Sequence, residues 1–254
     1  MKKIIFACIV LSLFACNDKK SGSKETTTAG ESTTESRPAS GCGKLILFHK
    51  GAVIGSTSYD AAGNVTSTTI TTVNEVTNEG GVLTATSSGQ MKSAATGDKT
   101  MNLVYKCDGN NLYMDINAML QNFEALNHVK GDIKPLQFPV NISVGQKLPD
   151  ASYTITIDKG IKMDVTSTYK NRTVAAMEKI TTKGGSWDCY KVTTDIDADI
   201  QGLDQTTKMI MESAKEKMKM SMTMWYHPEM GIVRIEMYHA GKVNTRTDIT
   251  SVTY

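Results

Sequence analysis

Residues 65–92 read VTSTTITTVNEVTNEGGVLTATSSGQMK, two runs rich in threonine and valine that meet at Gly80-Gly81. Threonine alternates here with Val, Ile or Ala, which is the period-two pattern of half-buried strands. Two adjacent glycines accept the positive φ angles that a tight hairpin turn needs. The stretch therefore predicts an antiparallel hairpin with strands at 65–77 and 81–92.

The same combination of alternation and turn residues recurs along the rest of the chain. It predicts further strands near 45–59, 100–107, 151–158, 161–170, 173–182, 187–201, 217–227, 231–239 and 242–253. Sequential strands joined by tight turns form antiparallel meanders. The chain is therefore expected to be mainly β.

One stretch has helical periodicity instead. Between Met114 and Asn127, apolar residues recur at spacings of three and four: Ile116, Met119, Leu120, Phe123 and Leu126. This pattern predicts a short amphipathic helix lying over a curved sheet. A thinner stripe at 205–217 indicates a second helix or a loop insertion.

The N-terminus reads MKKIIFACIVLSLFAC, two lysines and a short apolar run that ends in Leu13-Phe14-Ala15-Cys16. The run is too short to span a bilayer, which takes about 20 helical residues. It is typical of a bacterial lipoprotein signal peptide, with residues 1–15 removed and Cys16 lipidated. The protein is thus expected to be anchored to a membrane of the cell envelope. The outer membrane is favoured, with the leaflet left open.

Residues 16–40 are expected to form a disordered tether after the lipidated cysteine, because their Ser, Thr, Glu, Lys and Gly composition offers little to bury. Residues 41–254 contain no second linker and are expected to form a single β-rich domain. Removal of Lys2 and Lys3 with the signal changes 28 basic and 26 acidic residues to 26 of each. A neutral chain without a basic stripe does not fit a nucleic-acid partner.

Three cysteines follow the tether: Cys42, Cys107 and Cys189. An oxidising compartment favours one disulfide. Cys107 with Cys189 is the first choice, because each lies two residues after an aromatic side chain, with Cys42 as the alternative partner. Three inert buried thiols are the other option.

Two runs resemble metal sites, but each has a simpler explanation. Alternate methionines in 218–224 place thioethers on one strand face, as a Cu(I) site would need. Neighbouring sulfurs would lie roughly 6.8 Å apart, so inward-facing core methionines are the preferred interpretation. The aspartates of 195–199 lack the glycine and glutamate of a calcium loop and are expected to face solvent.

The remaining residues offer no catalytic, metal or cofactor motif. The four histidines, His49, His128, His227 and His239, are scattered without metal-site spacing, and neither a G-x-S-x-G nor a phosphate-loop motif occurs. No catalytic residue, metal or cofactor is therefore assigned, and the chain is not expected to be an enzyme.

Several short motifs occur in a characteristic order. They are YDAAGN at 59–64, YKCDG at 105–109, LQFP at 136–139, VGQKLPD at 144–150, NRTV at 171–174, EKITT at 178–182, GSWDC at 185–189, WY at 225–226 and GIVRIE at 231–236. Together they resemble the TapB-like lipoproteins of Bacteroidota, a family of unassigned function. The resemblance implies a large curved antiparallel sheet closing toward a half-barrel with one or two short helices, similar to LolA- and LolB-type folds. It transfers no catalytic residue.

Three functions are compatible with these features. The first is a lipid-anchored, non-enzymatic binding module whose cupped sheet holds an apolar ligand or an envelope protein. The second is a structural or adhesive surface protein without a ligand pocket. An envelope hydrolase ranks last because it would need a catalytic constellation.

Overall fold

The computed structural model describes residues 41–95, 97–115, 134–158, 162–202, 205, 209 and 219–254. Two short 3-10 turns open the domain, η1 (Cys42–Lys44) and η2 (Ile46–Phe48). The strands that follow are β1 (Val53–Asp60), β2 (Val65–Glu79), β3 (Val82–Ser93), β4 (Lys99–Cys107), β5 (Asn111–Met114), β6 (Gln137–Pro139), β7 (Ala151–Asp158), β8 (Lys162–Thr182), β9 (Gly185–Gln201), β10 (Met220–His227), β11 (Gly231–His239) and β12 (Lys242–Thr253).

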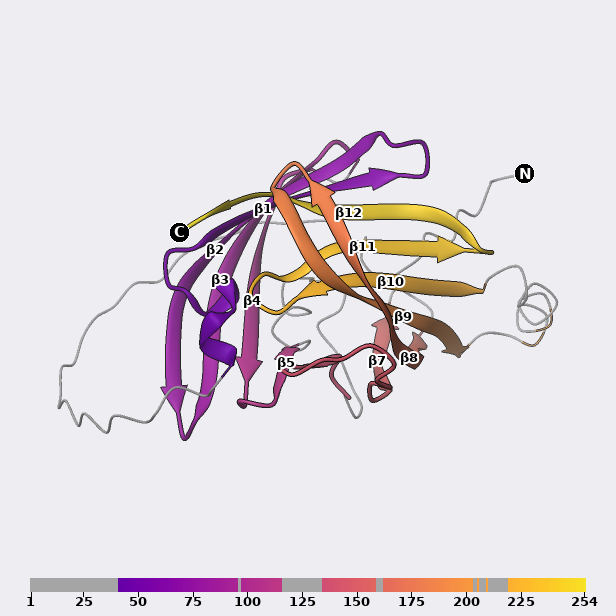
Figure 1. Cartoon of the computed structure of the whole chain (residues 1–254). Coiled ribbons are helices and arrows are strands. Elements are labelled where there is room, and N and C mark those ends of the chain that lie inside the picture. Colours follow the sequence, from indigo (N-terminus) through magenta and orange to yellow (C-terminus); the bar gives the residue numbers. More distant parts are fainter. Residues whose placement is uncertain are drawn as a thin grey trace, which may run out of the picture.

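All twelve strands belong to one antiparallel sheet in the order β6-β5-β4-β3-β2-β1-β12-β11-β10-β9-β8-β7. The sheet curves strongly and is nearly closed into a barrel (Figure 1). This confirms the predicted fold class. Among the described residues, no helix is long and apolar enough to cross a membrane.

The hairpin that the sequence marks most clearly forms as predicted. Gly80 and Gly81 have φ angles of 58° and 86°, which lets the β2–β3 turn close with Glu79 opposite Val82. Along β3, alternate side chains such as Leu83, Ala85 and Ser87 are buried. We call the face of the sheet that carries these residues the inner face.

The two edges of the sheet meet through a short seam. Lys134, just before β6, pairs with Ser152 of β7 through two backbone hydrogen bonds of 2.8 and 3.1 Å. The terminal strands of the linear order are thereby brought together. This seam closes the half-barrel.

Strand β8 departs from the prediction, because 161–170 and 173–182 are one strand instead of two. Bulges interrupt its pairing with β9 between Lys170 and Thr173 and between Val174 and Ala176. Asn171 within the first bulge has a φ of 54°, a conformation that asparagine tolerates. Bulges bend and twist a strand, and beyond them the β8–β9 hairpin crosses β10, β11 and β12 (Figure 1).

The predicted strand at 45–59 is wrong for its first half. Residues 45–48 are a continuous apolar run, and Ile46–Phe48 of it form η2; Leu45 and Ile46 are fully buried and Phe48 nearly so. The turn is fixed by a 2.7 Å hydrogen bond from the Ile46 N–H to the carbonyl of Glu229. A strand would turn every second of these side chains away from the core.

Two short strands were missed, and the predicted helices fall largely outside the described residues. Strands β5 and β6 have four and three residues, too few for a period-two pattern to stand out. Met114, the expected helix start, ends β5, and 116–127 are not described. Within 205–217, Gln205 and Met209 are described, both in helical conformation.

The disulfide joins Cys42 to Cys107, with the two Cα atoms 6.0 Å apart, and Cys189 is a free, buried thiol. The preferred pair Cys107–Cys189 is therefore wrong, and the alternative partner Cys42 is present. Cys107 ends β4 beside the entry of the chain at η1, whereas Cys189 lies in β9 opposite Glu178 of β8. The bridge ties the first turn of the domain to the sheet.

We predict that one of the three cysteines beyond residue 40, Cys189, reacts with a thiol reagent under denaturing, non-reducing conditions. Replacing Cys42 with Ser should lower the free energy of unfolding by about 4 kcal/mol, because the bridge closes a loop spanning 65 residues. Peptide mapping and chemical denaturation measure both effects. A Cys189→Ser variant as unstable as Cys42→Ser would contradict this assignment.

Candidate functional site

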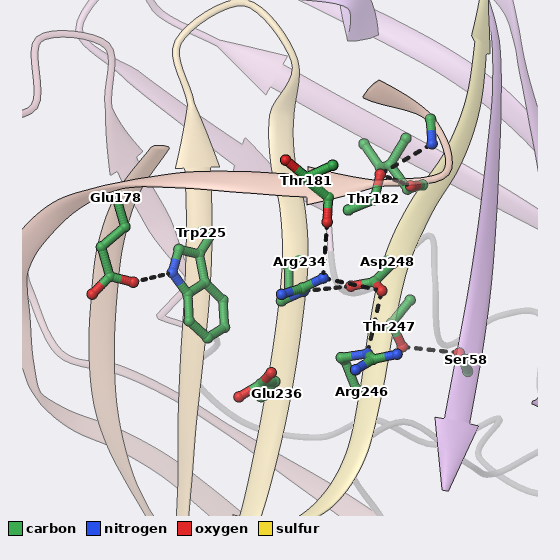
Figure 2. A network of polar contacts seen from close by, with 12 residues as sticks. Ser58, Glu178, Thr181, Thr182, Trp225, Arg234, Glu236, Arg246, Thr247 and Asp248 are labelled. Carbon is green, nitrogen blue, oxygen red and sulfur yellow. Dashed lines mark hydrogen bonds and ion pairs between the residues drawn. The ribbon is translucent and has the colours of Figure 1, made fainter. Parts of the chain in front are cut away.

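A polar network lies where the β8–β9 hairpin crosses the outer face of the sheet, the face opposite the inner one (Figure 2). The indole N–H of Trp225 donates to Glu178 Oε2 at 2.9 Å, and Lys191 Nζ lies 3.0 Å from Oε1 of the same carboxylate. These hydrogen bonds, that from Trp225 first, lower the pKa of Glu178. Trp225 is thus held at the junction between the hairpin and β10.

Ion pairs continue the network across β11 and β12. Arg234 forms a two-point contact with Asp248, at 2.6 and 3.3 Å, and Arg246 Nε lies 3.2 Å from Asp248 Oδ2. The Arg234 guanidinium also donates to the carbonyl of Thr181 at 3.4 Å. In Figure 2 these side chains lie beneath the crossing strand. Arg234 thereby joins Asp248 of β12 to Thr181 of the hairpin, and we call this network the clasp.

The tip of the hairpin packs directly on β12. The Thr182 hydroxyl donates to the carbonyl of Ile249 at 2.5 Å. At Gly184 an added Cβ would lie 3.1 Å from both Cγ2 and the carbonyl oxygen of Ile249, so glycine permits the close approach. These contacts hold the hairpin against β12, so the geometry of the clasp supports a structural role.

A shallow depression of about 240 Å³ adjoins the clasp on β9, β10 and β11. Its lining is rich in hydroxyl groups and consists of Thr193, Thr194, Asp195, Ser221, Met222, Thr223 and Tyr238. The Tyr238 hydroxyl donates to Glu236 at 2.6 Å, and burial raises its pKa to about 12. The volume is smaller than a typical small-molecule pocket.

A second cluster lies on the inner face and surrounds Arg172, which is 1% exposed. Its guanidinium donates to the carbonyls of Pro149 at 2.7 Å and Gln137 at 2.8 Å. It also lies over the Phe138 ring, 5.2 Å from the centroid, and Phe138 stacks on Tyr226 at 5.3 Å. We call Arg172, Phe138 and Tyr226 the Arg172 cluster.

The Arg172 cluster connects segments that are distant in the sequence. Arg172 lies in the β8 bulge, Gln137 and Phe138 in the edge strand β6, and Tyr226 in β10. Backbone hydrogen bonds reinforce this junction, with the Leu148 N–H donating to the Arg172 carbonyl at 2.9 Å. Burial lowers the pKa of Arg172 to about 10. Even so, the guanidinium carries its charge at neutral pH.

Sequence reasoning did not identify Arg172 or Tyr226 as site residues. Both lie within motifs that carried the family resemblance, NRTV at 171–174 and WY at 225–226. So do Phe138 in LQFP and Pro149 in VGQKLPD. Their place in these motifs was the signal that the sequence offered, and the structure shows that the motifs meet in one buried cluster.

Within the described part of the chain, three hydroxyls of the inner face are buried and lack a hydrogen-bond partner: Ser87 Oγ, Thr194 Oγ1 and Tyr226 Oη. Ser87 is opposite Val73 and Thr194 is opposite Met222, so both share a face with core residues. Burial raises the pKa of Tyr226 to about 12. Buried polar groups almost always have a partner, so these atoms are exceptions.

The residues predicted from the sequence fall in separate places. Cys16 lies outside the described residues, so its lipidation stays a prediction. Cys189 is buried in β9, and burial, with Asp188 adding to it, raises the pKa of the thiol to about 12. At neutral pH this thiol is protonated and a poor nucleophile.

The two metal-like runs adopt strand positions. Met222 and Met224 are buried in the core, as the core interpretation requires, and Met220 packs against it. Asp195, Asp197 and Asp199 are exposed on β9, with Asn171 donating to Asp195 and Lys170 paired with Asp197. Among the described residues, no three His, Cys, Asp or Glu side chains gather as a metal site would require.

These features define a class of protein, a nearly closed antiparallel half-barrel with a buried arginine at its seam. The chain belongs to the DUF3108-like family, whose model matches residues 49–249. A search of curated proteins finds no match. The finer resemblance to TapB-like lipoproteins, and to LolA- and LolB-type folds, stays a prediction.

Two solved structures share the fold. One is described as an exported protein with a YmcC-like fold, from Bacteroides fragilis, with 19% identity and a TM-score of 0.58 over 81% of this chain and 97% of that one. The other is described as a lipoprotein, from Parabacteroides distasonis, with 19% identity and a TM-score of 0.60 over 81% and 96%. At this identity the likeness establishes the fold alone.

We predict that Arg172→Lys lowers the free energy of unfolding by about 3 kcal/mol, because an ammonium cannot donate to both carbonyls in the planar geometry of a guanidinium. Chemical denaturation of the purified domain measures the change. Arg246→Lys is the matched control. That side chain is partly exposed and ion-paired, so its loss should cost less than about 1 kcal/mol. Equal effects of the two substitutions would refute a seam role for Arg172.

We predict that Tyr226→Phe stabilises the fold increasingly as the pH rises. The folded pKa of Tyr226 is about 12, above the ordinary 10.0, so from pH 10 to 12 the unfolded state loses the proton first and wild-type stability falls. The variant lacks this loss. Its advantage should therefore grow by about 1 kcal/mol between pH 10 and pH 11.

Urea denaturation at both pH values measures that difference. Tyr254→Phe is the control, since Tyr254 is 76% exposed and its substitution should leave the pH dependence unchanged. A Tyr226→Phe advantage that stays constant with pH would contradict the assignment.

Proposed function

We propose that the chain is a lipoprotein of the cell envelope, anchored through Cys16, whose half-barrel binds an apolar ligand on its inner face without catalysing a reaction. The signal-like residues 1–16 support the location. The descriptions of the two similar structures, as an exported protein and as a lipoprotein, support it as well. The outer membrane is the proposed site of anchoring.

The observation that carries the binding proposal is the set of unpartnered hydroxyls on the inner face. Ser87 and Thr194 are each 2% exposed and Tyr226 is fully buried. Leaving such a group unsatisfied costs about 1–3 kcal/mol. A largely apolar ligand that carries a few polar atoms would offset this cost, whereas an adhesive domain acting through its outer surface would leave these hydroxyls unsatisfied.

The chemistry of the described residues supports binding over catalysis. The free thiol of the described residues, Cys189, is buried and has a raised pKa. The carboxylates of the clasp, Glu178 and Asp248, are engaged by Trp225 and by arginine or lysine side chains. Groups held in such pairs are positioned for structure more than for proton transfer.

The test uses the full-length protein expressed in a bacterium of the same phylum and extracted from its membranes. Native mass spectrometry should find a non-covalent apolar ligand on the wild type. Cys16→Ser should move the protein from the membrane to the soluble fraction and leave that ligand in place, because anchor and binding face are separate.

Two outcomes would count against the proposal. A Cys16→Ser protein that stays membrane-bound after a carbonate wash would remove the anchor. A wild-type protein free of any apolar ligand would favour the structural or adhesive function, or one based on an envelope protein partner.

A further inference from the structure

The Arg172 cluster holds two polar groups that the fold leaves without partners. Arg172 Nε and Tyr226 Oη are both buried and make no hydrogen bond to any described residue. The side chains meet on a single ring, since the Arg172 Cζ lies 5.2 Å from the Phe138 centroid and Tyr226 stacks on Phe138 with the planes 12° apart. Two unsatisfied donors are thus placed around one aromatic side chain.

No carboxylate among the described residues forms an ion pair with Arg172. Both of its hydrogen bonds go to neutral backbone carbonyls, those of Pro149 and Gln137. Asp150 acts on it through charge at longer range. A buried cation normally pairs with an anion, because isolated burial of a charge costs several kcal/mol. The site therefore has the chemistry of an incomplete ion pair.

The surroundings of the cluster suit a molecule with an apolar tail. The inner face around it carries buried core residues. Met222 and Met224 lie on β10, the strand of Tyr226, and Val192 and Ile196 lie on the neighbouring strand β9. Gln137 and Phe138 belong to the edge strand β6, beside the seam formed by Lys134 and Ser152.

We propose that Arg172 and Tyr226 form the headgroup subsite for an acidic amphiphile, a molecule with a carboxylate or phosphate head and a hydrocarbon tail. The anionic head accepts hydrogen bonds from Arg172 Nε and Tyr226 Oη, and the tail lies along the inner face. This inference rests on the proposed apolar ligand and specifies its chemical class.

The experiment compares three probes on the full chain: oleate, oleyl alcohol and inorganic phosphate. Oleate and the alcohol share a tail and differ in the charged head. Isothermal titration should give oleate about tenfold tighter binding than the alcohol, the magnitude of one hydrogen bond to a charged group. Phosphate alone should bind far more weakly than oleate, because it lacks a tail to bury.

Variants locate the head. Tyr226→Phe keeps the ring that stacks on Phe138 and should reduce the preference for oleate over the alcohol several-fold. Arg172→Lys should reduce it as well, provided circular dichroism confirms folding. Tyr254→Phe is the matched control, because it removes a tyrosine hydroxyl that is 76% exposed and lies outside the cluster and the inner face. It should leave the preference unchanged.

The outcomes separate the two proposals. Equal affinity for oleate and oleyl alcohol, or a preference unaffected by Tyr226→Phe, would overturn the headgroup subsite and leave the apolar ligand standing. Binding of phosphate as tight as oleate would also overturn it, in favour of a free-anion site. Binding of neither oleate nor the alcohol would overturn both proposals.

Discussion

The burial of one guanidinium, that of Arg172, determines how the sheet closes. An open twelve-stranded sheet would expose two edges with unpaired backbone groups, which proteins avoid. Here the edges approach, and Arg172 donates to a carbonyl on each side of the junction, at Gln137 and at Pro149. Lysine offers a single point of charge, so only arginine has the planar reach to bridge them.

The position of Arg172 depends in turn on the bulge that holds it. With Asn171 in a left-handed conformation, β8 changes direction, and its two halves serve different parts of the molecule. The first half pairs with β7 and faces the inner core. The second half crosses the outer face, where Trp225 donates to its Glu178 and Arg234 donates to its Thr181 carbonyl. The bulged stretch of β8 therefore supplies a residue of the seam and redirects the strand toward the clasp.

The strands could be predicted from local sequence patterns. The seam and the disulfide could not, because they depend on contacts between residues distant in the sequence. Gly80-Gly81 and the threonine alternation around it report hairpin geometry within a few residues, so β2 and β3 were placed closely. The seam depends on backbone carbonyls of residues 137 and 149, and a carbonyl has no sequence signature. The Cys42–Cys107 bridge likewise required knowing that η1 packs beside the end of β4. An aromatic residue two positions earlier, the basis for choosing Cys189, reports only strand periodicity.

The same physics separates the two faces of the sheet in their capacity to bind. On the outer face both carboxylates of the clasp are engaged, Glu178 by Trp225 and Lys191, and Asp248 by two arginines. Such a network gains little from a further ligand. On the inner face a cation and three hydroxyls are removed from water without equivalent compensation. Because unsatisfied buried groups are where a ligand contributes most free energy, recognition is expected on the inner face, and the clasp serves to keep that face formed.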